Sequence, residues 1–193
     1  IDERSGEDNT YFFEGGITQF VKDLNKKVEV AAAVEINGEG VSPDNDDDKV
    51  EFDIAFMYND AYDEKLYSFV NNIRTPNGGT HEAGFRAGLT RVISNYNTQN
   101  GNAKDKDVKL TGEDVQEGLI AVVSVRVPEP QFEGQTKGKL GNTYVRTIIQ
   151  RLTYEHISKY FEENPLEAKA VVQKALLAAS ARVAAKKARE LTR

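Results

Sequence analysis

The order of apolar and polar positions predicts one helix followed by three strands in the first half of the chain. Apolar residues spaced by three and four predict a helix over Gly15–Leu24. Alternating or β-branched runs predict strands over Lys27–Ile36, Val50–Tyr58 and Leu66–Ile73. The last two strands are adjacent in sequence and separated by a polar turn, so we expect them to pair as an antiparallel hairpin.

The second half is predicted to contain one strand and several helices. A strand over Leu119–Val127 is the most apolar in the chain, which is typical of a central position in a sheet. Helical periodicity covers Phe85–Tyr96 and Val145–Ile157, and Thr111 with Asp114 resembles a capping box. Asn164 followed by Pro165 is a strong helix start, and the alanine-rich sequence after it is expected to stay helical to the end of the chain.

Strands that precede helices, with one late central strand, predict the α+β class. Glycine and asparagine at 37–40 are expected to end the first strand. The polar segment at 42–49 (SPDNDDDK) is expected to be a solvated loop, because it contains almost nothing that can be buried.

Composition narrows the chemistry that the 193 residues can perform. Without cysteine there are no disulfides, thiolate metal sites or cysteine nucleophiles, which fits a reducing cytosol. No apolar run approaches the roughly 18 residues that a membrane span needs. The only methionine is Met57, so we expect the chain to be a piece of a longer protein.

Charge is distributed unevenly along the chain. Residues 1–64 carry a net charge of −13 and residues 65–193 a net charge of +7. This asymmetry favours an anionic partner such as nucleic acid for the basic half, although a dipolar surface without a partner explains it too. The outward face of the helix after Phe85 carries Arg86 and Arg91, and the last twelve residues form a basic arm.

Few side chains are arranged for catalysis. His81 and His156 are interpreted as structural, because neither lies in a catalytic triad motif. No metal site is predicted, since the acidic run at 46–48 lacks the spacing of a calcium loop. The glycine-punctuated loop at 131–141 contains Gln135 and Lys137, which could contact a phosphate; a plain flexible loop is the alternative.

Several separate blocks of the sequence closely resemble the B subunit of bacterial DNA gyrase and its relative, the B subunit of topoisomerase IV. A weaker match begins at Tyr11–Gly16. The blocks are Asn71–Ile73, Gly78–His81 with Gly84–Arg86, Gly112–Val115 with Glu117–Leu119, Val127–Phe132, Gln135–Lys137 with Lys139–Gly141, Glu163–Pro165 and Ala188–Arg193.

This resemblance implies the transducer domain of an ATP-dependent type II DNA topoisomerase. It implies a fold similar to the second domain of ribosomal protein S5: a four-stranded sheet with helices on one face, a left-handed βαβ crossover and a long C-terminal helix. Residues 1–163 would form the transducer domain, and residues 164–193 the helix that leads toward the DNA gate. The acidic segment at 37–49 matches no motif of the family and is expected to be a variable hairpin loop.

The resemblance also implies site residues and partners. Lys137 and Gln135 would contact the γ-phosphate of ATP, while ATP and Mg²⁺ would be bound mainly by the neighbouring ATPase domain. Arg86 and Arg91 would line the hole that holds double-stranded DNA. The partners would be the ATPase and cleavage domains of the same subunit and the gyrase A subunit, in a cytoplasmic A2B2 heterotetramer that couples ATP hydrolysis to strand passage and negative supercoiling.

Alone, this piece is expected neither to hydrolyse ATP nor to cut DNA. Three other interpretations remain open from the sequence. The first is a topoisomerase IV transducer, which acts in decatenation. The second is a nucleic-acid-binding α+β module without nucleotide contact. The third is a scaffold that dimerises through its long helix.

Overall fold

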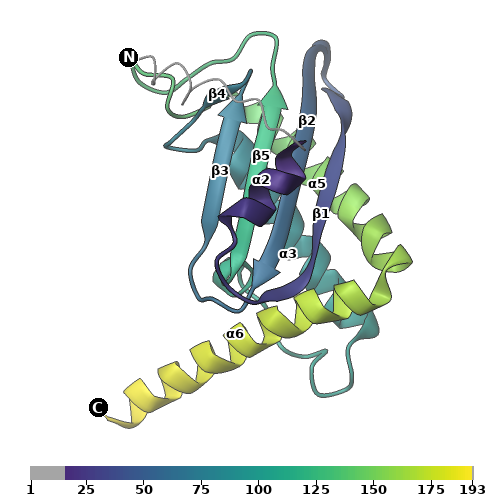
Figure 1. Cartoon of the computed structure of the whole chain (residues 1–193), viewed down its shortest axis with the longest axis vertical. Coiled ribbons are helices and arrows are strands. Elements are labelled where there is room, and N and C mark those ends of the chain that lie inside the picture. The colour runs from purple at the N-terminus through teal and green to yellow at the C-terminus, as the bar shows by residue number, and fades with distance from the viewer. Residues whose placement is uncertain (1–15, 193) are drawn as a thin grey trace.

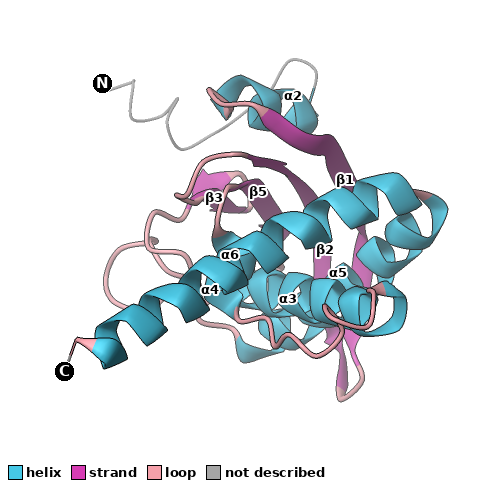
Figure 2. Cartoon of the chain, turned by 90° about the horizontal axis from the view of Figure 1, so that it is seen from below, coloured by secondary structure: helices cyan, strands magenta, loops and turns pink. Residues whose placement is uncertain are grey.

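The computed structural model describes residues 16–192 and contains a five-stranded mixed sheet with helices on both faces (Figures 1 and 2). Residues 1–15 and 193 lie outside the described part, and with them most of the block at 11–16. The elements are α2 (Gly16–Leu24), β1 (Glu29–Ser42), β2 (Asn45–Asn59), β3 (Lys65–Val70), β4 (Ile73–Arg74), α3 (Thr80–Asn100), α4 (Gly112–Gln116), β5 (Leu119–Arg126), α5 (Thr143–Glu163) and α6 (Pro165–Leu191).

Strand β5 lies at the centre of the sheet, as its apolar sequence predicts. The strand order is β1-β2-β5-β3-β4, with β5 antiparallel to β2 and parallel to β3. Its successive residues from Leu119 to Val123 are all buried, so both of its faces are covered. Side chains such as Ala121 and Val123 join the large core under α3, α5 and α6, whereas Ile120 and Val122 join a smaller core under α2.

The predicted hairpin between Val50–Tyr58 and Leu66–Ile73 is wrong, because β5 lies between these two strands. The chain instead reverses its direction within the predicted strand Leu66–Ile73. Asn71 and Asn72 have φ angles of 51° and 69° and form a two-residue turn that pairs Val70 with Ile73. Asparagine tolerates this left-handed conformation, which two-residue hairpin turns require. The short β4 that results makes the sheet five-stranded rather than four-stranded.

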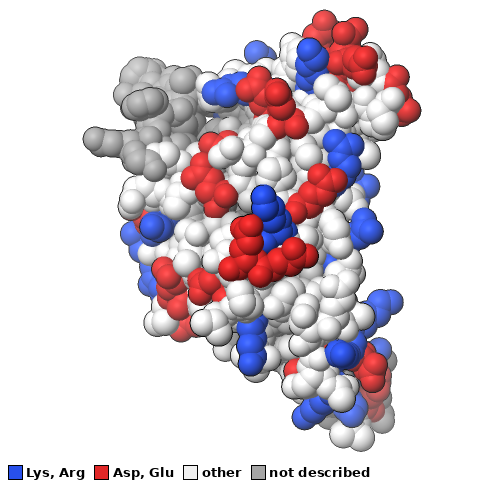
Figure 3. Space-filling model, turned by 90° about the vertical axis from the view of Figure 1, so that its right-hand side faces the viewer, with Lys and Arg blue, Asp and Glu red and all other residues white. Residues whose placement is uncertain are grey.

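The first strand does not end at 37–40, and most of the predicted loop at 42–49 is strand. β1 and β2 form one long hairpin that turns at residues 43–44, so the expected hairpin over 37–49 is confirmed. Gly40 is needed for packing rather than for a break: a Cβ there would lie 2.8 Å from Leu152 and 2.9 Å from Ile148 of α5. The acidic hairpin tip projects into solvent, and Figure 3 shows acidic side chains gathered at that end of the molecule.

The expectation of helices on one face is wrong for α2. Helices α3 and α5 cover one face and α2 covers the other (Figure 2). α3 and α5 approach closely through glycines. A Cβ at Gly84 would lie 2.6 Å from the carbonyl oxygen of Arg146, and one at Gly88 would lie 2.7 Å from that of Gln150. These contacts leave no room for any larger residue at either position.

Helix α6 begins after Asn164, as predicted, although Asn164 does not cap it through its side chain. Its first turn is tied to the sheet, where Glu167 Oε1 accepts a 2.6 Å hydrogen bond from the Ala32 N–H. Farther along, Arg182 donates two 3.0 Å hydrogen bonds to Asp114, whose capping box with Thr111 is confirmed.

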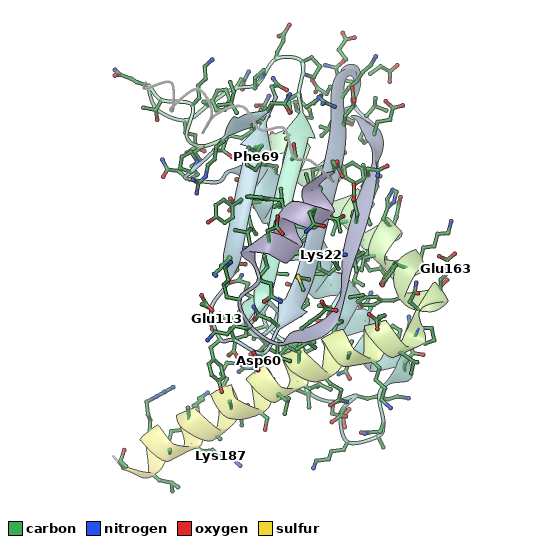
Figure 4. All side chains as sticks on the ribbon, in the orientation of Figure 1. Lys22, Asp60, Phe69, Glu113, Glu163 and Lys187 are labelled. Carbon is green, nitrogen blue, oxygen red and sulfur yellow. The ribbon has the colours of Figure 1, made fainter. Side chains whose placement is uncertain are left out.

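Residues 183–191 of α6 and the following Thr192 are exposed, so this end of the helix forms the expected basic arm. Figures 1 and 4 show it extending away from the sheet, with Lys187 near its end.

An acidic pair lies on the α2 side of the sheet. Burial, together with a hydrogen bond and charge repulsion from Glu35, raises the pKa of Asp53 to about 7. The carboxyl group of Asp53 therefore binds its proton more tightly in the folded protein than in the unfolded chain.

We predict that Asp53→Asn stabilises the protein more at pH 8 than at pH 5. Between the unfolded pKa near 4 and the folded pKa near 7, rising pH removes stability from the wild type, and an amide cannot ionise. We expect a difference of about 1 kcal/mol, reduced because the side chain is partly exposed. Urea unfolding at the two pH values measures it, with Asp46→Asn at the exposed tip as the control. An equal effect at both pH values would contradict the prediction.

Candidate functional site

The loop that joins β5 to α5 is closed at its base by Asn142. Asn142 Oδ1 accepts a 2.7 Å hydrogen bond from the Gln131 N–H, and its Nδ2 donates to the Glu129 carbonyl at 3.2 Å. The Gly141 N–H donates to the Gln131 carbonyl at 2.7 Å. Asn142 precedes α5 but makes no side-chain cap, because its amide is used to close the loop.

Above the base, the two sides of the loop remain paired. Phe132 and Leu140 form an antiparallel bridge, and Leu140 is fully buried. The Glu133 N–H donates to the Lys139 carbonyl at 2.9 Å, and the two side chains form an ion pair at 3.4 Å. Only residues 134–138 form the tip, so the loop is held in place rather than flexible throughout.

The tip presents Gln135 and Lys137 to solvent. Both side chains are exposed, and neither has a hydrogen bond or an ion pair within residues 16–192. An ammonium group carries three donors and an amide two, so this tip can donate several hydrogen bonds to an anion. We name residues 134–138 the Lys137 tip.

The amino end of α5 does not extend this anion site. It lines a hollow together with Asp47, Asp48, Lys49 and Glu129, so acidic side chains outnumber basic ones there and an anion is disfavoured. The Lys137 tip is therefore the part of the loop that remains available to a phosphate.

The sequence-based expectation that Arg86 faces outward is confirmed only in part, because its side chain is 34% exposed. Its guanidinium is half-buried and donates two hydrogen bonds to Glu64, at 2.7 and 3.2 Å, and one to Glu82 at 3.2 Å. The hydrogen bond to Glu64 is the main cause that raises the pKa of Arg86. Glu64 precedes β3 and was not singled out from the sequence, because nothing in its local pattern indicates a partner 22 residues away.

Arg91 is exposed, as expected, and its guanidinium lies 4.7 Å from the centre of the Tyr154 ring. This cation–π contact leaves its hydrogen-bond donors available to an anion. Within residues 16–192, no hydrogen bond or ion pair joins either arginine to the Lys137 tip.

Both histidines are structural. His81 is fully buried, its Nε2 lies 3.0 Å from Thr75 Oγ1, and burial lowers its pKa to about 3. Its ring is thus neutral at pH 7 and cannot act as an acid–base group there. His156 packs edge-to-face against Phe52.

Neither a metal centre nor a membrane span was found in the described part of the chain. Residues 16–192 contain no group of three or more histidine, aspartate or glutamate residues that could hold a metal ion. Among the same residues, no helix combines the length and apolar character needed to cross a bilayer.

A family model described as DNA gyrase B matches residues 16–191. The chain is 61% identical to the DNA gyrase B protein of Campylobacter jejuni and 51% identical to that of Clostridium acetobutylicum, in each case over its whole length. It spans only 24% and 30% of these two relatives.

Solved structures with the same fold come from related proteins. The 43K ATPase domain of Thermus thermophilus gyrase B, in complex with an aminocoumarin, superposes with a TM-score of 0.80 at 39% identity, over 92% of this chain and 46% of that one. The topoisomerase IV ATP-binding domain of Francisella tularensis gives 0.73 at 28% identity, over 90% and 45%.

We predict that Arg86→Ala lowers the free energy of unfolding by about 1–3 kcal/mol, because it leaves two partly buried carboxylates without their cation. Arg91→Ala is the matched control on the same helix and should cost no more than about 1 kcal/mol. Urea unfolding of this chain measures both. Equal effects of the two substitutions would mean that the Glu64–Arg86–Glu82 cluster does not stabilise the fold.

Proposed function

The chain belongs to the DNA gyrase B family, and from this membership we propose that it is the transducer domain of an ATP-dependent type II DNA topoisomerase. In this proposal, residues 1–163 form the transducer and residues 164–193 the helix that leads toward the DNA gate. The piece couples ATP binding and hydrolysis in a neighbouring ATPase domain to clamp closure, strand passage and negative supercoiling. Alone, it is proposed to be inactive.

The observation that carries this proposal is the Lys137 tip. Lys137 and Gln135 are exposed donors on a loop whose base is fixed, an arrangement suited to reaching into a site on another domain. The structural relatives are described as ATPase or ATP-binding domains, and this chain covers less than half of each of them. The remaining half of those domains can therefore contain a separate nucleotide-binding part. ATP and Mg²⁺ would be bound mainly by that part.

The proposed mechanism is a population shift between two orientations of the domains. Lys137, supported by Gln135, would donate charge-assisted hydrogen bonds to the γ-phosphate and so hold the two domains together. Such a contact contributes about 1.5–3 kcal/mol, which biases the orientation roughly ten- to hundredfold. After hydrolysis Lys137 loses this contact, and the domains can rotate.

The S5-like fold is part of the same proposal. It is supported by β3 and β5, which are parallel neighbours joined through α3 on one face of the sheet. In Figure 1 both strands point upward, β5 lies to the right of β3 and α3 lies behind them, which corresponds to a left-handed crossover and thus departs from the usual rule.

The proposed partners are the ATPase and cleavage domains of the same subunit, the A subunit of a cytoplasmic A2B2 enzyme and double-stranded DNA. For DNA, the exposed Arg91 and the basic arm of α6 are better placed than Arg86, whose donors are engaged by Glu64 and Glu82. The sequence is 61% identical to a gyrase B relative but 28% identical to the topoisomerase IV structure, which favours a gyrase over a topoisomerase IV.

We predict that Lys137→Ala in the full-length subunit, assembled with its partner subunit and DNA, lowers kcat for ATP hydrolysis by about 10- to 100-fold. Nucleotide affinity should change little, because other residues would bind most of the nucleotide. Steady-state hydrolysis and equilibrium nucleotide binding measure the two effects.

Lys139→Ala is the matched control, because it removes a charge from the same loop outside the Lys137 tip. It should hydrolyse ATP at the wild-type rate. Normal turnover by Lys137→Ala would remove the nucleotide contact from the proposal and leave a DNA-lining module as the better interpretation.

A further inference from the structure

Two glycine-containing segments about 60 residues apart in sequence are joined backbone to backbone beside the Lys137 tip. The Asn77 N–H donates to the Gly138 carbonyl at 2.8 Å, the Leu140 N–H donates to the Gly78 carbonyl at 3.1 Å, and the Thr80 N–H donates to the Leu140 carbonyl at 3.1 Å. We propose that residues 77–80, which lead into α3, are the positioning element that holds Lys137 for its phosphate contact. This inference rests on the proposed function of Lys137.

Gly79 makes this junction possible. Its φ of 137° lies in a region that residues with a side chain rarely adopt, and a Cβ there would lie 2.5 Å from both the nitrogen and the oxygen of Leu140. Both atoms belong to the backbone and are hydrogen-bonded, so no side-chain rotation could relieve the clash. Leu140 cannot retreat either, because its own side chain is fully buried in the core.

The junction fixes the chain immediately next to Lys137. Gly138 follows Lys137 directly, and its carbonyl is held by Asn77. Lys139 is held from the other side of the loop by the Glu133 N–H. The Lys137 tip is thus anchored on its C-terminal side by two independent backbone hydrogen bonds, which reduces the conformational entropy that the loop backbone loses when Lys137 binds a phosphate.

The positioning segment itself rests on a buried polar network at the start of α3. Glu82 Oε2 accepts a 2.6 Å hydrogen bond from Ser68 Oγ, which lies 2.8 Å from Thr75 Oγ1; Thr75 in turn contacts His81. A Cβ on Gly78 would lie 2.7 Å from Glu82 Oε1, so the segment packs directly on this carboxylate. The buried His81 is thus part of the network that supports residues 77–80, a role that the sequence around His81 does not indicate.

The first test is Gly79→Ala in the full-length subunit, assembled with its partner subunit and DNA. A displacement of about 1 Å at a reacting group can lower a rate on the order of 100-fold, so we expect kcat for ATP hydrolysis to fall at least about tenfold. Nucleotide affinity should stay within about twofold of the wild type, because a positional defect acts on turnover rather than on the bulk of binding. Gly141→Ala is the matched control, since its nearest neighbour would lie 3.4 Å away.

A second pair of variants decides the matter if Gly79→Ala does not fold. A Cβ at Gly138 would lie 2.9 Å from Asn77 Nδ2 and 3.4 Å from Thr136 Oγ1, so the branched side chain of Gly138→Val would crowd the junction from both sides, and we expect it to disturb the junction and lower kcat about fivefold or more. Adding Asn77→Ala removes the obstructing amide but keeps the backbone N–H. The double variant should therefore recover to within about twofold of Asn77→Ala alone, a coupling that general loss of stability would not produce.

The outcomes separate this inference from the proposed function. If Lys137→Ala loses turnover while a folded Gly79→Ala or Gly138→Val keeps it, the positioning role is wrong and the phosphate contact stands. If Gly138→Val loses turnover but Asn77→Ala does not restore it, the positioning role is again wrong. If Lys137→Ala keeps normal turnover, both are wrong.

Discussion

The burial of β5 on both of its faces is the constraint on which the rest of the structure depends. Consecutive side chains of a strand point to opposite faces of the sheet. A strand whose consecutive residues are all apolar can therefore bury them only if other elements cover both faces of the sheet at that strand. In this structure β2 and β3 are the neighbours of β5, α3 and α5 cover one face, and α2 covers the other. The loops at the ends of β5 then lie beside those of β3, which is how the Lys137 tip comes to meet the start of α3.

Close backbone approach is the second organising feature. Gly84 and Gly88 let α3 lie against α5, Gly40 lets α5 lie against the hairpin, and Gly79 lets the start of α3 lie against Leu140. In each case the atoms that a Cβ would meet belong to a segment distant in sequence. Glycine is therefore required at these positions because a side chain would collide with that segment. The same logic connects the fold to the proposed function, because the tightest of these approaches holds the loop that carries Lys137.

Charge is distributed less simply than the sequence suggests. The two arginines of α3 differ: Arg86 stabilises the domain through Glu64 and Glu82, whereas Arg91 keeps its donors accessible above a tyrosine ring. The outermost charges, on the acidic hairpin tip and on the basic arm of α6, project in different directions from the sheet (Figures 1 and 3). For the proposed contact with DNA, the arm and Arg91 are therefore better candidates than Arg86.

The sequence by itself determined the α+β class, the central position of β5, the capping box at Thr111 and the start of α6, because these depend on local periodicity and capping chemistry. It also singled out Lys137 as a candidate phosphate contact. Only the tertiary structure decided the order of the strands, the fifth strand, the pairing of Arg86 with Glu64 and the junction at Gly79. These features depend on contacts between residues far apart in the chain, and a single sequence does not show which distant positions will meet.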